Sequence, residues 1–368
     1  MNYSLISISK NKKLLSVLLE SVILSMIISI TASCIFLSGV IGIGRDYGNY
    51  EDIINDILHS GFSLENNYNF DIGFVFIIFL LTQLLFSAKL IYAFLIFISL
   101  FLKFLIFSFL GLYNKKYSNV SLTHLGIIGG LILYSSRFFP LHEFTQIRVA
   151  ISIAFFYYAF IIIESDTKIK QEIFGFINNR LLNIIGISCA ILCVLFHTIA
   201  LVHLPLTFLT VFCNSRKKII LVNALIFLFF WIAFPIIINN DFSPISYSAI
   251  SRIGSYLQES SDSSSLKIYH VLDFVFIIIC FYLVDFKSPL QRALFSMYTF
   301  SLTISLAITI GLPYLLVFSV RLSEYIQTFC VPLIITMSGH RKYLLIWPWI
   351  IACSIYYLSA YQASNYFL

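Results

Sequence analysis

The chain has 368 residues, of which 60% are hydrophobic, 17% aromatic and only 11% charged. Because soluble globular proteins carry about 25% charged residues, this chain cannot cover a water-facing surface with polar groups. Its formal net charge of +6 is scattered through short loops, which bears on membrane orientation and argues against nucleic-acid binding. The apolar runs are continuous and not alternating, so we predict an all-α polytopic integral membrane protein and exclude a β-barrel.

A spanning helix needs about 20 mostly apolar residues, and about 11–12 segments approach or exceed that length. These transmembrane or re-entrant helices are predicted at residues 14–42, 72–88, 90–112, 121–136, 144–163, 182–201, 203–214, 219–238, 270–284, 293–316, 322–338 and 343–361. The first run is too long for a signal-peptide core and is expected to be retained. With no repeat and no soluble segment, residues 1–368 are predicted to form a single transmembrane domain.

The loop charges predict how the chain lies in the membrane. Lysines before the first segment place the N-terminus in the cytoplasm. The loop 43–71 holds one arginine and six carboxylates and is predicted to be external, as is the polar loop 239–269. If 72–88 and 90–112 both crossed, the later basic loops would fall outside. Segment 72–88 is therefore expected to be short, re-entrant or interfacial.

The first candidate motif directly follows the first segment, where the chain reads Arg45-Asp46-Tyr47 with Tyr50 three residues later. Arg45 is a candidate to bind an anion, and Tyr47 and Tyr50 are candidates to stack on a sugar ring. Asp46 is a candidate catalytic carboxylate. The alternative is a helix cap beside a belt of interfacial aromatic residues.

The second motif contains Arg137, His142, Glu143, Gln146 and Arg148, at the mouth of the apolar run 151–163. An arginine at the centre of a spanning helix costs roughly 2.5–3.5 kcal/mol on insertion scales, so such residues usually face an interior cavity and often serve function. If a helix begins near residue 141, its positive end also suits an anion. The alternative is a structural ion pair between Glu143 and one of the arginines.

A third candidate is His197, in Phe196-His197-Thr198 near the outer end of a middle helix that Pro205 is expected to break. A lone histidine in a spanning helix is more often a hydrogen-bonded packing residue than a catalyst. Its place on the side of the arginines keeps a catalytic role open beside the packing role, because an imidazole has a suitable unperturbed pKa for proton transfer.

Two later segments add candidate substrate-binding residues. Arg252 lies in the loop 239–269, on a stretch 250–257 that is predicted to form a short amphipathic helix. Arg321, Glu324 and Tyr325 lie in a late apolar segment, where Arg321 and Glu324 are spaced to pair on one helix face. That pair would either contact substrate or only lower the cost of insertion.

Absent motifs narrow the chemistry further. The chain has no Gly-x-x-x-x-Gly-Lys-Ser/Thr phosphate loop, no Asp-x-Asp pair and no His-Glu-x-x-His motif. We therefore expect no metal and no cofactor. Several arginines on one side of the membrane are suited to hold an anion, and phosphate is the expected one.

At these residues the chain resembles the EpsG/Wzy class of bacterial polysaccharide polymerases. The shared features are Arg-Asp-Tyr-x-x-Tyr (Arg45, Asp46, Tyr47, Tyr50), Ile-Arg at a helix start (Ile147, Arg148), Phe-His-Thr (Phe196, His197, Thr198) and Arg-x-x-x-Tyr (Arg321, Tyr325). They extend over most of the chain, in this order. One departure is Val149, where a polar glutamine is expected.

The resemblance implies a membrane glycosyltransferase, for which a GT-C-like arrangement of the helices is one option. It would polymerise undecaprenyl-diphosphate-linked repeat units of O-antigen, capsule or exopolysaccharide at the periplasmic or outer face of the bacterial inner membrane. A chain-length regulator is a candidate partner. Arg148 would hold the diphosphate first, followed by Arg45, Arg137 and Arg321. His197, His142 and Asp46 are the candidate general bases.

Three other functions remain open from the sequence. A lipid-linked oligosaccharide flippase would need cationic groups reachable from both faces, and usually an internal repeat. An O-antigen ligase shares the arginines and the lipid-diphosphate donor. A membrane acyltransferase is expected to carry a histidine early in the first helix, where this chain has none.

Overall fold

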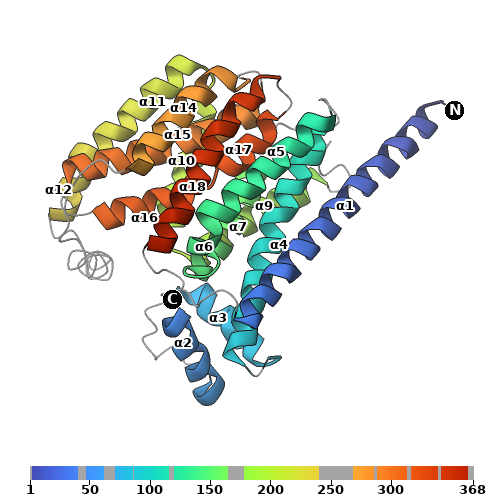
Figure 1. The fold of residues 1–368 in the computed structure, drawn as a ribbon, viewed down its shortest axis with the longest axis vertical. Coiled ribbons are helices and arrows are strands. Elements are labelled where there is room, and N and C mark those ends of the chain that lie inside the picture. The colour runs from blue at the N-terminus through green and yellow to red at the C-terminus, as the bar shows by residue number, and fades with distance from the viewer. Residues whose placement is uncertain are drawn as a thin grey trace. The chain divides into compact units, whose positions relative to one another are not determined.

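The described part of this computed structural model is helical throughout, with no strand (Figure 1). It comprises residues 2–39, 47–61, 71–85, 87–115, 120–164, 178–239, 268–285, 288–312, 316–338 and 341–363. A lipid bilayer offers the backbone no hydrogen-bond partners, so continuous apolar runs such as these become helices. The all-α prediction is confirmed.

Seven helical stretches in the described residues are long and apolar enough to cross a membrane, which makes the chain a multi-pass membrane protein. They are Leu19–Ser38, Ala88–Gly111, Ile147–Glu164, Asn179–Phe196, Arg216–Ile236, Pro289–Gly311 and Tyr343–Gln362. Three further apolar helices are shorter: Ile72–Thr82, Ala200–Phe212 and Ile268–Leu283.

The chain divides into two compact units. Unit 1 comprises Met1–Leu201, Ile334–Arg341 and Ile350–Leu368, and unit 2 comprises Val202–Leu333 and Lys342–Trp349. Each unit contains helices long and apolar enough to cross a membrane, such as Ala88–Gly111 in unit 1 and Pro289–Gly311 in unit 2, so this division differs from one between a membrane and a soluble domain. The single transmembrane domain stays a prediction.

Unit 1 is built around two packed pairs of helices. Its elements are α1 (Asn2–Ser38), α2 (Tyr47–Ser60), α3 (Ile72–Thr82), α4 (Ala88–Lys115), α5 (Val120–Leu133), the π-helix η1 (Tyr134–Phe138), α6 (Phe139–His142), α7 (Ile147–Glu164) and α9 (Asn179–Phe196), with parts of α17 (Cys330–Met337) and α18 (Trp347–Ala363). Helix α1 packs along α4, and α7 packs against α9 and α4 (Figure 1). The Ser33 hydroxyl donates to the Ala93 carbonyl at 3.0 Å, and the Ser152 hydroxyl donates to the Cys193 carbonyl at 2.6 Å. Such hydrogen bonds hold helices together where lipid removes the hydrophobic driving force.

Helix α3 confirms the expectation for segment 72–88. It has 11 residues, which at 1.5 Å per residue reach about 17 Å, well short of a bilayer core of about 30 Å. It packs against α9 and leaves Asp71, the residue before its first turn, inside unit 1.

The helix that carries Arg148 begins later than expected. A π-helix interrupts the predicted span 121–136, α6 follows it, and residues 143–145 form a turn before α7 begins at Ile147. The turn is held to α4, where the Tyr92 hydroxyl donates to the Phe144 carbonyl at 3.0 Å. Arg148 therefore lies in the first turn of α7, and the start near residue 141 was wrong.

Two other predicted boundaries were also wrong. Helix α9 ends at Phe196, and Pro205 lies inside the following helix, α10 (Ala200–Phe212). The break thus falls at His197 and not at Pro205. A membrane helix tolerates an internal proline when its surroundings satisfy the freed backbone carbonyl. The predicted span 322–338 is two helices, α16 (Leu316–Gln327) and α17, with a turn between them.

Unit 2 is centred on α15. Its elements are most of α10, α11 (Arg216–Leu228), the π-helix η2 (Phe229–Ala233), α12 (Phe234–Asn239), α14 (Ile268–Leu283), α15 (Pro289–Gly311), α16, most of the 3-10 helix η4 (Arg341–Ile346), and parts of α17 and α18. Helix α15 packs against α11, α14, α16 and η2. Ser288 caps its first turn and Pro289 occupies the first helical position, a typical helix start.

Candidate functional site

Two of the predicted site residues meet on a carboxylate inside unit 1. Nη1 of Arg148 lies 3.1 Å from Oδ2 of Asp71, and Nδ1 of His197 lies 3.2 Å from the same oxygen. Oδ1 of Asp71 accepts the backbone N–H of Thr198 at 3.3 Å. Three elements supply the group: Asp71 precedes α3, Arg148 opens α7 and His197 ends α9.

Burial differs sharply within this cluster. The Asp71 side chain is 2% exposed, whereas those of Arg148 and His197 are 22% and 17% exposed. The carboxylate therefore lies at the base, and the guanidinium and imidazole retain surface that a ligand can reach. A buried carboxylate needs such partners, because an unpaired charge in this environment is costly.

The surroundings hold Asp71 in its ionised form. Burial by itself raises the pKa of the Asp71 carboxyl, but the hydrogen bond and charge of His197, the charge of Arg148 and the Thr198 N–H together lower the pKa below its usual value. An ionised carboxylate only accepts hydrogen bonds, so the hydrogen lies on Nδ1 of His197. In the neutral ring, Nε2 then carries the lone pair.

A glycine permits the close approach of α3 and α9. A Cβ at Gly73 would lie 2.8 Å from both Cβ and the carbonyl oxygen of Leu195. Gly73 is two residues after Asp71 and Leu195 is two residues before His197, so this contact sets the distance between the carboxylate and the imidazole.

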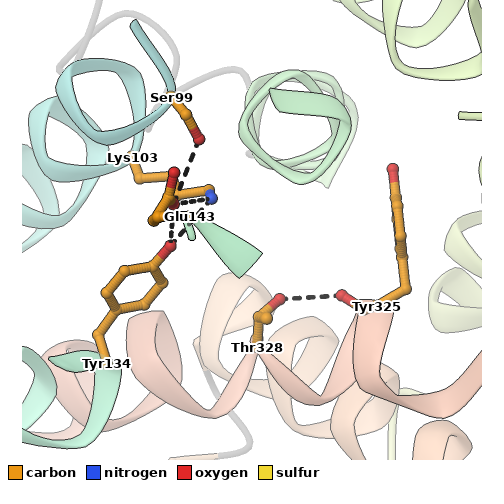
Figure 2. Close-up of polar contacts among 6 residues, drawn as sticks. All are labelled: Ser99, Lys103, Tyr134, Glu143, Tyr325 and Thr328. Carbon is orange, nitrogen blue, oxygen red and sulfur yellow. Dashed lines mark hydrogen bonds and ion pairs between the residues drawn. The ribbon is translucent and has the colours of Figure 1, made fainter. Parts of the chain in front are cut away.

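A second polar cluster lies fully buried between α4, η1 and the turn before α7 (Figure 2). Lys103 Nζ lies 2.6 Å from Oε1 of Glu143, and both side chains are 0% exposed. The same oxygen accepts the Tyr134 hydroxyl at 2.6 Å and the Ser99 hydroxyl at 3.3 Å. The ion pair anticipated between Glu143 and an arginine is therefore a pair with Lys103, which pins the turn to α4.

The other residues of the second motif lie in different surroundings. Arg137, only 2% exposed, places its guanidinium 5.0 Å from the ring centre of Phe138 and 4.8 Å from that of Tyr357. The fully buried His142 ring stacks on Phe138, so its position favours packing over proton exchange. Gln146 is buried just before α7, and its Nε2 has no hydrogen-bond partner among the described residues.

Tyr47 and Tyr50, at the start of α2, are 4% and 2% exposed. The Tyr47 ring lies 5.0 Å from that of Tyr92, and the Tyr50 ring lies 5.4 Å from that of Phe74. The two tyrosines thus join α2 to α3 and α4 as a buried aromatic cluster, which differs from the belt of interfacial aromatic residues named as the alternative. Stacking on a sugar stays a prediction.

The late motif belongs to unit 2. Arg321 and Glu324 are half-buried on α16, and Tyr325 is buried with its ring stacked on that of His203, 4.9 Å away. The Tyr325 carbonyl accepts the Thr328 hydroxyl at 2.9 Å, where α16 ends (Figure 2). Substrate contact by these three residues stays a prediction.

Unit 2 also contains buried polar groups that sequence reasoning missed. His270 and Asp273, one turn apart on α14, face α15: His270 Nε2 lies 3.0 Å from the Ser305 hydroxyl, and the Tyr298 hydroxyl donates to Asp273 at 2.6 Å. Their spacing of three residues in an apolar run was the available signal.

Arg45, Asp46, Arg252 and the helix expected at 250–257 lie outside the described residues. Within the described residues, no group of three or more histidine, cysteine, aspartate or glutamate side chains is placed to hold a metal ion. The arrangement in unit 1 offers different chemistry: a cation for an anionic leaving group and an imidazole that can take a proton, both joined to one carboxylate.

Comparisons with known proteins agree with the resemblance seen in the sequence. No protein of curated function and no solved structure matches the chain. A family model, that of the EpsG family, matches residues 22–368, nearly the whole chain. This match supports a polysaccharide-polymerase type of membrane function. The chain belongs to the EpsG family.

Proposed function

We propose that this protein joins oligosaccharide repeat units carried on undecaprenyl diphosphate into O-antigen, capsule or exopolysaccharide. The supporting observation is the convergence of Arg148 and His197, from two helices, on one oxygen of Asp71. The acidic loop 43–71 supports placing this chemistry at the outer face, because loops rich in lysine and arginine stay in the cytoplasm.

In the proposed reaction, the growing chain is the donor and a sugar hydroxyl of a new lipid-linked unit is the acceptor. The hydroxyl oxygen bonds to the anomeric carbon of the donor, and the bond from that carbon to the diphosphate oxygen breaks. His197 takes the hydroxyl proton, and undecaprenyl diphosphate leaves with the electron pair. Arg148 stabilises the negative charge that grows on the diphosphate, without a metal.

A gel of surface polysaccharide tests this function in cells that attach repeat units to a lipid core. Cells that lack the chain are expected to show a single repeat unit on the core, and return of the intact chain is expected to restore a ladder. Complete loss of the repeat unit would contradict a polymerase, because it is the outcome for a flippase or a ligase.

A further inference from the structure

Asp71 lies at the base of the cluster, yet the proposed reaction assigns it no task. Its Oδ2 is shared by Arg148 and His197, and its Oδ1 accepts the N–H of Thr198. A carboxylate with this many donors and 2% exposure is itself fixed in place. It can therefore fix the groups that touch it.

The first effect of Asp71 is on His197. An acceptor at Nδ1 keeps the hydrogen there, so Nε2 presents the lone pair that a general base needs. The negative charge also stabilises the imidazolium that forms when the ring takes a proton. Both effects favour proton transfer from an acceptor hydroxyl.

The second effect is on Arg148. The Arg148 guanidinium is paired with Asp71, so a bound diphosphate must share that cation with a resident anion. Like charges at short range cost binding energy. Asp71 therefore weakens the affinity of the site for every lipid diphosphate, including the product that must leave after each transfer.

We propose that Asp71 is a positioning residue and an internal counter-anion, which orients His197 for proton transfer and limits the affinity of Arg148 for the lipid diphosphate. This proposal rests on the proposed function. The two effects act in opposite directions on binding and on turnover, and a residue that only supports the fold produces no such split.

The test uses the full chain in lipid nanodiscs, with undecaprenyl diphosphate as the binding probe. Turnover is measured on lipid-linked repeat units from cells that lack the chain. Asp71→Asn is expected to tighten undecaprenyl diphosphate binding roughly tenfold, because it removes one adjacent like charge. It is expected to lower kcat about tenfold or more, because the amide no longer sets the tautomer of His197.

The pH profile provides a separate readout. Among the described residues, the charged groups shown within this cluster are Asp71 before α3 and Arg148 on α7. In sequence, the titratable residue of α9 that lies nearest to His197 is the buried Cys193. A neighbouring carboxylate raises the pKa of an imidazole, and the base works only when neutral. In Asp71→Asn, the fall of kcat on the acid side of its pH profile should therefore move to lower pH. Asp71→Glu keeps the charge, so this acid limb of the profile should stay close to that of the parent.

Two glycines provide matched variants if Asp71→Asn does not fold. Gly73→Ala would bring a Cβ to 2.8 Å from the carbonyl oxygen of Leu195 beside the cluster, and Gly186→Ala would bring one to 2.8 Å from Cγ2 of Ile162 near the middle of α9. Both should lower the unfolding temperature by a few degrees, as expected for about 1 kcal/mol of overpacking. Only Gly73→Ala should reproduce the lower kcat and tighter binding of Asp71→Asn.

The outcomes separate the two proposals. If Arg148→Ala and His197→Ala abolish turnover but Asp71→Asn binds and turns over as the parent does, the role of Asp71 is refuted and the proposed function stands. Weaker undecaprenyl diphosphate binding by Asp71→Asn, with an unmoved acid limb, also refutes it. If Arg148→Ala and His197→Ala both stay active, the proposed function itself fails.

Discussion

Replacing Arg148 by alanine is expected to lower kcat/KM for polymer formation by at least about 10²-fold, because a lost contact to developing transition-state charge costs roughly 3 kcal/mol. Arg148 is suited to this contact by position and by chemistry. It lies in the first turn of α7, where the helix dipole adds positive potential, and it is 22% exposed. Its planar fork matches two phosphate oxygens at once.

Lysine at the same position separates charge from geometry. Arg148→Lys keeps the positive charge but loses the two-pronged hydrogen bond, so its loss should be intermediate, about tenfold. Arg180→Ala is the matched control, because Arg180 is an exposed arginine at the start of α9 in the same unit. The measurement is polymer formed per minute from purified lipid-linked units. Arg148→Ala within twofold of the parent would remove Arg148 from the mechanism.

Arg148 and His197 could be identified from the sequence because charge inside an apolar run is rare and costly, and such residues usually serve function. Asp71 could not be identified in this way, because it is one of six carboxylates in a loop expected to be external. A signal was nevertheless present, since Asp71 is the last of the six and directly precedes an apolar helix. A single sequence does not show which of six carboxylates faces inward, because that depends on the packing of α3 on α9.

The sequence alone also does not show which residue pairs with Glu143. Its burial and need for a partner could be anticipated, but Lys103 lies 40 residues away on α4. Pairing over that separation depends on tertiary packing. The predicted spans were right where apolar runs were long, as for α4, α7 and α15. They were wrong at helix ends and breaks, because tertiary contacts determine where a helix begins and ends. An example is the hydrogen bond from the Tyr92 hydroxyl to the Phe144 carbonyl, in the turn before α7.

Among the polar contacts of unit 1, the Lys103–Glu143 pair is expected to cost the most stability when only one of its two partners is removed. Lys103→Met leaves a buried carboxylate, and Glu143→Leu leaves a buried ammonium. Each is expected to lower the free energy of unfolding by about 3–5 kcal/mol. Lys89→Met on the same helix is the control, since Lys89 is exposed and its loss should cost less than about 0.5 kcal/mol.

The double variant tests whether the two charges stabilise each other. Lys103→Met with Glu143→Leu removes both charges and replaces them by apolar groups, so it should recover most of the stability that either single variant loses. Unfolding of the purified chain in one detergent measures all four proteins. Losses that simply add would show that the two charges do not stabilise each other.

Activity of the double variant then separates stability from placement. Glu143 lies in the turn five residues before Arg148, and its Oε1 accepts from three groups, Lys103, Tyr134 and Ser99. These contacts hold the turn from which α7 begins. An apolar pair restores packing but has no such directional bonds. The double variant is therefore expected to be stable yet turn over about tenfold more slowly than the parent, because small displacements of a catalytic group cost rate. Full activity would show that the ion pair stabilises the fold and has no part in placing Arg148.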